Sequence, residues 1–197
     1  MKDELLIIFY RNPILGKVKT RLAATLGDEK ALAIYLHMAA YTRTITENLH
    51  LDKAVFYSEH VDTEDNWSNT SFKKQLQHGE DLGERMKHAF TWAFDSGYKS
   101  VCIIATDCLE LTSETILDAF DCLEIGDIVI GPARDGGYYL LGMTQLQEPF
   151  FKNKQWGMHT VFSDTLEDIN EAKLTYELLP ILHDVDEEGD LPKRFRL

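Results

Sequence analysis

Residues 4–22 read ELLIIFYRNPILGKVKTRL, an apolar run followed directly by a basic segment. The run at 4–10 contains two isoleucines and two aromatic residues and ends just before the turn-forming pair Asn12 and Pro13. A short apolar run with these features predicts a buried β-strand. The basic segment is therefore expected to form the loop that leaves this first strand.

Strand and helix patterns alternate along the rest of the 197-residue chain. Strands are predicted at 53–58, 100–107, 127–132, 138–143 and 174–180, helices at 26–49, 80–98, 111–123 and the second half of 156–172, and a polar connection at 61–75. This alternation is typical of an α/β fold with helices on both faces of a doubly wound sheet. The strands at 127–132 and 138–143 are too close for a parallel crossover, so we expect an antiparallel element in a mostly parallel sheet. We expect residues 1–197 to form a single domain, because no linker or internal repeat is visible.

Apolar residues at helical spacing define the inner faces of two predicted helices. They are Leu82, Met86, Ala89, Phe90 and Ala93 in the helix at 80–98, and Ile116, Leu117, Phe120 and Leu123 in the helix at 111–123. Thr112 stands where the second of these helices begins and is predicted to be its N-cap.

The composition excludes several classes of protein. A formal net charge of −13 argues against a nucleic-acid partner. No stretch approaches the ~18 consecutive apolar residues of a membrane span, and the N-terminus lacks the positive region of a signal peptide, so we expect a cytoplasmic protein. Cys102, Cys108 and Cys122 have no CxxC spacing and are predicted to be free, reduced and mostly buried.

The loop after the first strand is basic although the chain is acidic. It contains Arg11, Lys17, Lys19 and Arg21, and no Asp or Glu occurs between Leu5 and Gly27. In an open α/β sheet, ligands bind outside the carboxyl ends of the strands, where this loop begins. Since Lys and Arg donate charge-assisted hydrogen bonds to phosphate, we predict a phosphate-binding loop, with a solvated surface loop as the alternative.

Two better-known phosphate loops are excluded. A Walker A loop needs Gly at position 11 and Ser or Thr at position 18, where this chain has Arg11 and Val18. A Rossmann GxGxxG is absent, because Gly16 is the only glycine before Gly27. The phosphate site is therefore predicted to depend on side-chain charge.

Three acidic segments contain further candidate ligands. Asp107 follows the strand at 100–107 and is either an oxygen ligand for Mg²⁺ or Mn²⁺ or a helix cap or turn residue. The glycines of ARDGG at 133–137 allow the backbone to approach a ligand, or form a tight hairpin. The late acids Asp184, Asp186 and Asp190 are, by themselves, typical of a solvated acidic run.

These pieces together resemble a family. The motifs FxRxPxxGKxKTRL, GxDLGERM, TDCxxL, GPARDGGYYLLG, a Trp followed by TVF, and DVD…DL occur in this order between about residues 5 and 191. The same order is found in a largely uncharacterised group of GT-A-type transferases, often labelled glycosyltransferases and linked to arsenosugar-type biosynthesis. The chain is more distantly similar to the molybdopterin-guanine-dinucleotide and phospholactate-guanylyl nucleotidyltransferases. The resemblance implies a three-layer, GT-A-like α/β fold of the nucleotide-diphospho-sugar transferase type.

The resemblance also implies roles for individual residues. The basic residues Lys17, Lys19 and Arg21, together with Arg11, would hold the phosphates of a nucleotide, and Gln77 and Arg85 would lie near its base or ribose. Asp107 and Asp186 would bind a divalent ion, Mg²⁺ or Mn²⁺. The acceptor pocket would be bordered by Asp135, Gly136, Gly137 and Tyr138. Two positions depart from the family pattern, Leu109 where Pro is usual and Glu187 where Thr is usual.

The implied activity is a metal-dependent transfer from a nucleotide-activated donor to a small acceptor. We expect a glycosyltransferase that uses a nucleotide sugar. A nucleotidyltransferase that uses a nucleoside triphosphate and a phosphorylated acceptor is the alternative, since the same loop and ion serve both reactions. A nucleotide-binding module without turnover is the alternative of another class.

Overall fold

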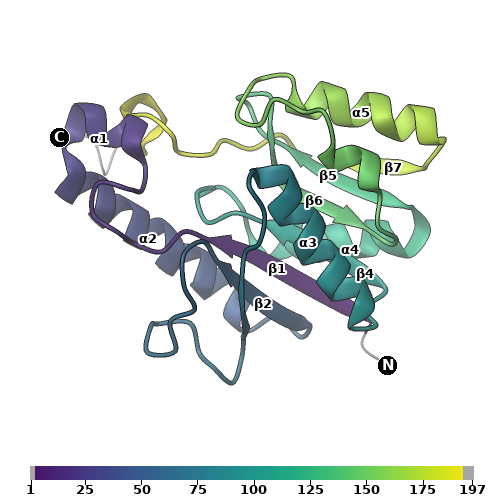
Figure 1. Cartoon of the computed structure of the whole chain (residues 1–197), viewed down its shortest axis with the longest axis horizontal. Helices are drawn as coiled ribbons and strands as arrows, with labels where there is room; N and C mark the ends of the chain where they lie inside the picture. Colours follow the sequence, from purple (N-terminus) through teal and green to yellow (C-terminus); the bar gives the residue numbers. More distant parts are fainter. Residues whose placement is uncertain (1–2, 193–197) are drawn as a thin grey trace.

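The computed structural model describes residues 3–192, and the strands of this part form one seven-stranded sheet (Figure 1). The strands are β1 (Glu4–Tyr10), β2 (Asp52–Tyr57), β3 (Lys73–Leu76), β4 (Ser100–Ile104), β5 (Ile128–Pro132), β6 (Tyr138–Met143) and β7 (Tyr176–Leu178). The helices are α1 (Thr20–Leu26), α2 (Asp28–Glu47), α3 (Leu82–Asp95), α4 (Ser113–Ile125) and α5 (Val161–Ala172), with short 3₁₀ helices η1 (Glu148–Phe151) and η2 (Glu188–Asp190).

The sheet is mixed, as the spacing of its strands predicts. Its order is β3-β2-β1-β4-β6-β5-β7. Only β6 runs against its neighbours, since it pairs antiparallel with β4 and with β5, whereas the other pairs are parallel. The five-residue connection between β5 and β6 allows only the antiparallel arrangement.

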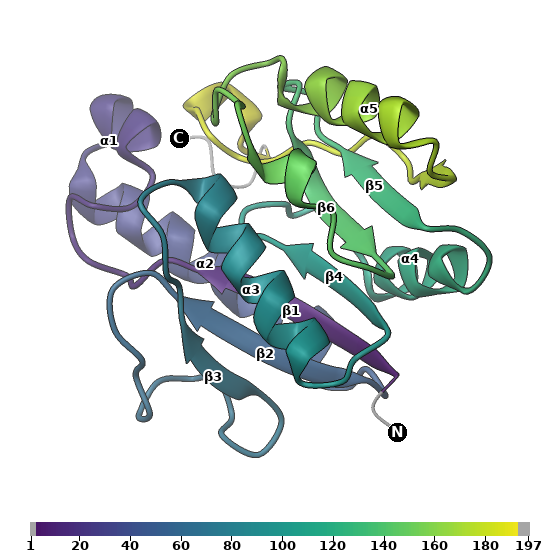
Figure 2. The ribbon, with the colours of Figure 1, turned by 45° about the vertical axis from the view of Figure 1, so that its right-hand side comes forward.

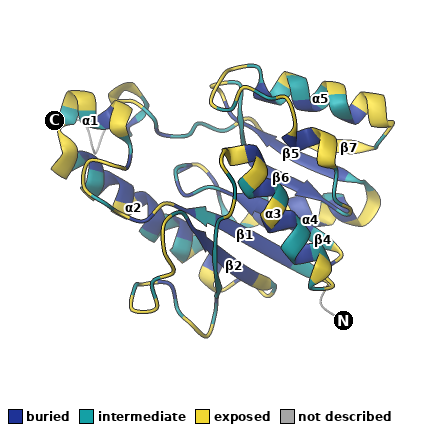
Figure 3. Ribbon diagram, in the orientation of Figure 1, coloured by how far each residue is buried: buried dark blue, intermediate teal, exposed yellow. Residues whose placement is uncertain are grey.

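Helices cover both faces of the sheet, which gives three layers (Figure 2). Along β1 the side chains alternate, so that Leu6 and Ile8 join the apolar cluster that contains α2 and α4, while Leu5 and Ile7 join the one that contains α3, α5 and η1. Burial on both faces explains why β1 is a continuous apolar run and does not alternate with polar residues. The strands β1, β2, β4, β5 and β6 are accordingly the most deeply buried elements, whereas the outer strands β3 and β7 are half-buried and exposed (Figure 3).

The structure corrects several details of the sequence-based prediction. An additional parallel strand that was not predicted, β3, ends the polar segment at 61–75, and the short helix α1 begins within the basic segment. Neither has a clear apolar period, because β3 is a half-buried edge strand and α1 buries only Leu22. Leu82 and Leu117 are exposed and do not belong to the inner faces of α3 and α4.

Other local predictions are confirmed. The Thr112 side chain accepts a hydrogen bond from the Thr115 N–H and caps α4. All three cysteines are free, with Cys102 and Cys108 buried and Cys122 intermediate. Among the described residues, no helix is long and apolar enough to cross a membrane.

The directions of the strands bring several loops to one edge of the sheet. Since β6 is antiparallel to both β4 and β5, the strands β1 to β5 and β7 all point the same way. Their carboxyl ends lead into the basic segment, Gln77, Asp107, Asp135 and the late acidic run. We call this side of the sheet the carboxyl edge.

Candidate active site at the carboxyl edge

Lys19 is at the centre of the site. Its Nζ lies 2.9 Å from Oδ2 of Asp107 and 2.8 Å from Oδ1 of Asp186, although 88 and 167 positions separate these acids from it in sequence. Arg21 adds a longer contact of 3.5 Å from Nη1 to Oδ2 of Asp186. The Lys19 side chain is only 10% exposed, so its ammonium group is held inside the cluster.

The backbone of Lys19 is in an uncommon conformation. Lys19 precedes α1 and has a φ of 47°, in the left-handed region that costs a non-glycine residue about 1–2 kcal/mol. Residues in such conformations cluster at functional sites, where surrounding contacts hold them in place. The two carboxylate contacts are the contacts that offset this cost here.

The charges of the cluster shift the pKa of Lys19 and of Asp186. Burial lowers the pKa of Lys19, but the charges of Asp107 and Asp186 outweigh it, so that the pKa is raised. Burial raises the pKa of Asp186, but Lys19 outweighs it and the pKa is lowered. The two shifts agree that both groups are charged. The pKa of Asp184 shifts in the opposite direction from that of Asp186, because burial and the charges of Asp107 and Asp135 raise it to about 6.

The late acidic run reaches the site along the carboxyl edge. The yellow C-terminal segment in Figure 1 runs from the end of the sheet near β7 to α1. The Val185 N–H donates to the Asp107 carbonyl at 2.9 Å, and the carboxylate of Asp190 accepts from the backbone N–H groups of Asp186 and Glu187. These bonds fix the segment, with Val185 buried and the acids on either side of it partly exposed.

The other basic residues of the segment are more exposed than Lys19. Arg11 is exposed directly after β1, its backbone N–H donates to the Tyr35 hydroxyl, and its carbonyl accepts from the same hydroxyl. Its charge contributes to the lowered pKa of Asp186. Lys17 is exposed, and the Arg21 side chain is 64% exposed. Three cationic groups are therefore accessible around one buried ammonium.

The two residues predicted to lie near the base or ribose are placed at the β2–β3 end of the carboxyl edge. The Gln77 side-chain amide donates to the Phe56 carbonyl at 2.8 Å, and its backbone N–H donates to the Tyr57 carbonyl. Arg85, in the first turns of α3, donates from Nε to the Gly79 carbonyl at 3.0 Å. Both side chains therefore hold the loop between β3 and α3, and both are half-buried.

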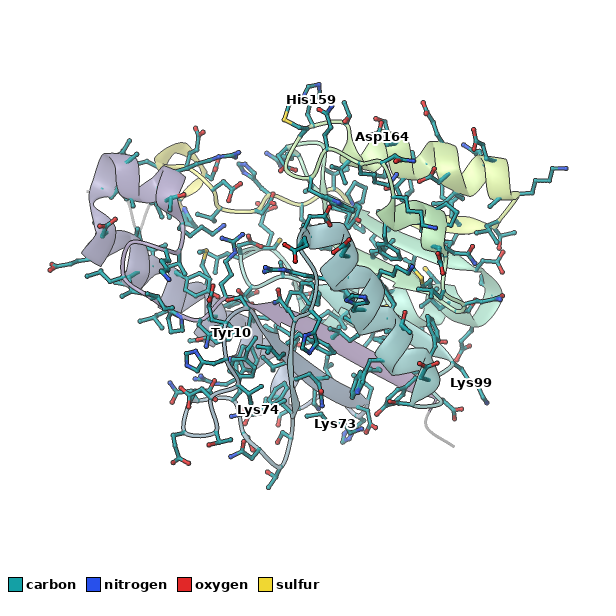
Figure 4. All side chains as sticks on the ribbon, viewed as in Figure 1. Tyr10, Lys73, Lys74, Lys99, His159 and Asp164 are labelled. Atoms are coloured by element: carbon teal, nitrogen blue, oxygen red, sulfur yellow. The ribbon has the colours of Figure 1, made fainter. Side chains whose placement is uncertain are left out.

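The predicted acceptor segment forms a tight turn between β5 and β6. Asp135 Oδ1 accepts the Gly137 N–H at 2.8 Å, and Gly136 has a φ of 91°. A Cβ on Gly136 would lie 2.1 Å from the His159 carbonyl oxygen, so the loop before α5 presses directly on the turn. Figure 4 shows His159 and Asp164 on this side, far from Lys73 and Lys99 at the opposite edge. The Tyr138 hydroxyl is buried and, among the described side chains, has no hydrogen-bond partner.

Two features of the site were not foreseen from the sequence. Tyr35 anchors the backbone of Arg11 through its hydroxyl. Trp156 lies against Gly83 at the start of α3, where a Cβ would meet the indole ring at 2.6 Å. Gly83 of DLGERM and Trp156, which precedes TVF, both belong to motifs found in the sequence, but no sequence pattern indicated that they are in contact.

The carboxylates of Asp107 and Asp186 suit a hard divalent ion whose remaining coordination positions are filled by a bound ligand. Two carboxylates converge on one positively charged atom, and Mg²⁺ commonly takes one or two carboxylates together with phosphate oxygens and water. Within residues 3–192, no group of three or more His, Cys, Asp or Glu side chains is arranged to hold an ion without such help. The residues therefore fit an ion that arrives with a phosphate ligand.

Comparison with known proteins identifies relatives of this chain. A family described as "Uncharacterized protein conserved in bacteria (DUF2064)" matches residues 41–158, more than half of the chain. A solved structure from Desulfovibrio desulfuricans G20, provisionally named a nucleotide-diphospho-sugar transferase, is 34% identical and covers 95% of this chain and 84% of its own, with a TM-score of 0.86. No curated protein matches the chain.

More distant structures share the fold. The inositol-1-phosphate CTP transferase from T. maritima is 11% identical and covers 98% of this chain and 94% of its own, with a TM-score of 0.55. A CMP:2-keto-3-deoxy-manno-octonic acid synthetase complexed with CTP is 8% identical and covers 98% and 97%, with a TM-score of 0.59. The predicted nucleotide-diphospho-sugar transferase fold is thus confirmed.

Proposed function

The chain belongs to the bacterial family DUF2064, and from this membership and its site we propose that it is a transferase that uses a nucleotide-activated donor, with a nucleotide sugar as donor and a small molecule as acceptor. The observation that carries the proposal is the convergence of Lys19, Asp107 and Asp186 at the carboxyl edge. This edge is where α/β sheets bind ligands. Paired acids beside a basic loop are suited to an ion and a diphosphate.

Arg11, Lys17 and Arg21 are proposed to bind the donor phosphates. All three are exposed at the edge of the Lys19 cluster, and each charge-assisted hydrogen bond to phosphate contributes roughly 1.5–3 kcal/mol. Gln77 directly follows β3, two strands from β1, a separation of roughly 10 Å at the usual strand spacing, and Arg85 of α3 is hydrogen-bonded to Gly79 in the loop after Gln77. This separation suits a base and ribose extending from the phosphates.

Asp107 and Asp186 are proposed to hold Mg²⁺ or Mn²⁺ together with the donor phosphates. When bound, such an ion neutralises charge on the leaving group. The fixed cations of the basic loop act in the same direction, because they are placed before the reaction begins.

The turn from Asp135 to Tyr138 is proposed to border the acceptor. Asp135 is exposed and its Oδ1 is engaged by the Gly137 N–H, an arrangement that fixes the carboxylate in one orientation. In glycosyl transfer, an acceptor oxygen attacks the anomeric carbon, the bond from that carbon to the diphosphate breaks, and the acceptor proton is released. We propose that the exposed carboxylate of Asp135 accepts a hydrogen bond from such a hydroxyl.

Nucleotidyl transfer is the second candidate function, because two enzymes that use CTP share this fold. There, an acceptor phosphate oxygen attacks the α-phosphorus and pyrophosphate leaves. A panel of nucleotide sugars and nucleoside triphosphates with Mn²⁺, first by thermal shift and then by product analysis, separates the two. Release of a nucleoside diphosphate supports glycosyl transfer, and release of pyrophosphate supports nucleotidyl transfer. Binding without turnover with every acceptor offered would support the non-catalytic module.

Arg21→Ala is expected to weaken binding of the preferred nucleotide about tenfold, because a charge-assisted phosphate contact is lost. The side chain is 64% exposed and its contact with Asp186 is long, so stability should change by about 0.5 kcal/mol or less. Isothermal titration calorimetry measures the first effect and urea unfolding the second. Lys99→Ala is the matched control, since it removes one positive charge from an exposed pair with Asp3 at the opposite edge (Figure 4). Equal nucleotide affinity in both variants would contradict the role of the loop.

Arg85→Ala is expected to lower both donor affinity and stability. Its hydrogen bond to the Gly79 carbonyl holds the loop that contains Gln77, and loss of a charged donor costs about 1–3 kcal/mol. Calorimetry with the preferred nucleotide should show at least severalfold weaker binding. A loss of stability with unchanged donor affinity would assign Arg85 a purely structural role.

A further inference from the structure

The Lys19 ammonium lies where a divalent ion would have to bind. Its Nζ contacts one oxygen of Asp107 and one oxygen of Asp186 at 2.9 and 2.8 Å, distances that match strong ion pairs. The Lys19 side chain is 10% exposed, whereas the side chains of Asp107 and Asp186 are 27% and 38% exposed, so the ammonium is the most shielded group of the three. The two carboxylates therefore already share a cation that is part of the chain, which offsets one of their two negative charges.

An ion that arrives alone must compete with this ammonium. Displacing Lys19 from both acids would leave a largely buried positive charge without the partners that it has in the structure, which is costly. Arg21 adds repulsion, because its Nη1 lies 3.5 Å from Oδ2 of Asp186. Phosphate oxygens change the balance, since they are strong acceptors for Lys19 and ligands for the ion at once.

We propose that Lys19 is an internal counter-ion that keeps divalent ions out of the Asp107–Asp186 site until the phosphates of a nucleotide engage its ammonium group. The inference rests on the proposed function and adds the order in which nucleotide and ion bind. Nucleotide and ion bind cooperatively, and neither acid accepts the ion while Lys19 bridges the pair. The left-handed backbone at Lys19, directly before α1, sets the side chain at the point where the acids meet.

Titration with Mn²⁺ alone tests the proposal without requiring a donor or turnover. Electron paramagnetic resonance measures the free Mn²⁺, and the difference from the total gives the Mn²⁺ that is bound to the full chain. Lys19→Met removes the ammonium and keeps an unbranched side chain, and it should bind Mn²⁺ at least tenfold more tightly than the wild type. Arg21→Met is the matched control, because it removes the same charge from Asp186 without opening the bridge. Its gain in Mn²⁺ affinity should be only a few-fold, since an exposed charge is screened.

The location of the gained site is checked with a double variant. Lys19→Met combined with Asp107→Asn should lose the gain, because one of the two carboxylates has become a neutral amide. If Lys19→Met fails to fold, Lys19→Gln, whose amide can still donate to one acid, takes its place in the same titration. Equal Mn²⁺ affinity in the Lys19 variant and in Arg21→Met overturns the proposal, as does a wild type that binds Mn²⁺ at Asp107 as tightly without nucleotide as with it.

The outcome is separable from that of the proposed function. A gain in Mn²⁺ affinity on removing Lys19 can be observed even if the chain binds none of the nucleotides tested, in which case only the donor assignment fails. Tight nucleotide binding without such a gain leaves the donor assignment intact and rejects the counter-ion role.

Discussion

Asp107→Asn is expected to lower transferase turnover by about two to three orders of magnitude, the range seen when one electrostatic stabiliser of a transition state is removed. The amide has nearly the same shape as the carboxylate, so packing around it should be preserved. It has no negative charge to hold an ion, and it leaves Lys19 with Asp186 as the remaining carboxylate of the pair. Turnover with the preferred donor and calorimetry of Mn²⁺ with nucleotide present measure the two consequences.

Asp127→Asn is the matched control for this prediction. Asp127 also stands next to a strand and its carboxylate accepts hydrogen bonds from Thr175, but it precedes β5 at the opposite edge of the sheet. It should reduce stability without affecting Mn²⁺ binding. Unchanged Mn²⁺ affinity in Asp107→Asn would falsify the ion site outright. If Asp184→Asn weakens Mn²⁺ binding and Asp186→Asn does not, the second ligand is Asp184 in place of Asp186.

Gly136→Ala is expected to destabilise the protein by about 3 kcal/mol or more. Its φ of 91° already disfavours a side chain by about 1–2 kcal/mol. The added Cβ would also lie 2.1 Å from the His159 carbonyl oxygen, which is backbone and cannot rotate away. The turn or the loop before α5 must therefore move, and the acceptor side of the site moves with it.

Gly97→Ala separates the two contributions to this loss. Gly97 has the same φ of 91°, but a Cβ there would meet nothing within 4 Å. Urea unfolding should show a loss of about 1–2 kcal/mol for Gly97→Ala, from backbone strain alone, and a distinctly larger one for Gly136→Ala. Equal losses would mean that the loop carrying His159 does not press on the turn in solution.

Local sequence was sufficient for most of the fold. The apolar run of β1, the capped helix α4 and the short connection between β5 and β6 were each predicted from neighbouring residues, because periodicity and turn chemistry act over a few positions. The errors occurred where burial depends on partners from elsewhere in the chain. Edge strand β3 is polar and Leu82 is exposed, and no local pattern distinguishes these cases from a loop or a buried helix face.

Motif order similarly predicted which residues gather at the carboxyl edge. Lys19, Asp107 and Asp186 were each named as candidates from the motif in which they occur, and the structure brings all three into contact. The direction of the strands contributes to this arrangement, since parallel strands end at the same edge of the sheet.

The ion pairing within the site is a property of the tertiary structure. Lys19 was predicted as a loop residue that binds phosphate, and in the structure it is largely buried between one acid from the segment after β4 and one from the C-terminal segment. A local pattern records which residue types follow a strand, whereas the approach of a side chain to another 88 or 167 positions away depends on strand order and on how the last segment crosses the sheet. The hydrogen bond from Val185 to Asp107 completes that crossing, and it sets the distance between the acids that Lys19 bridges.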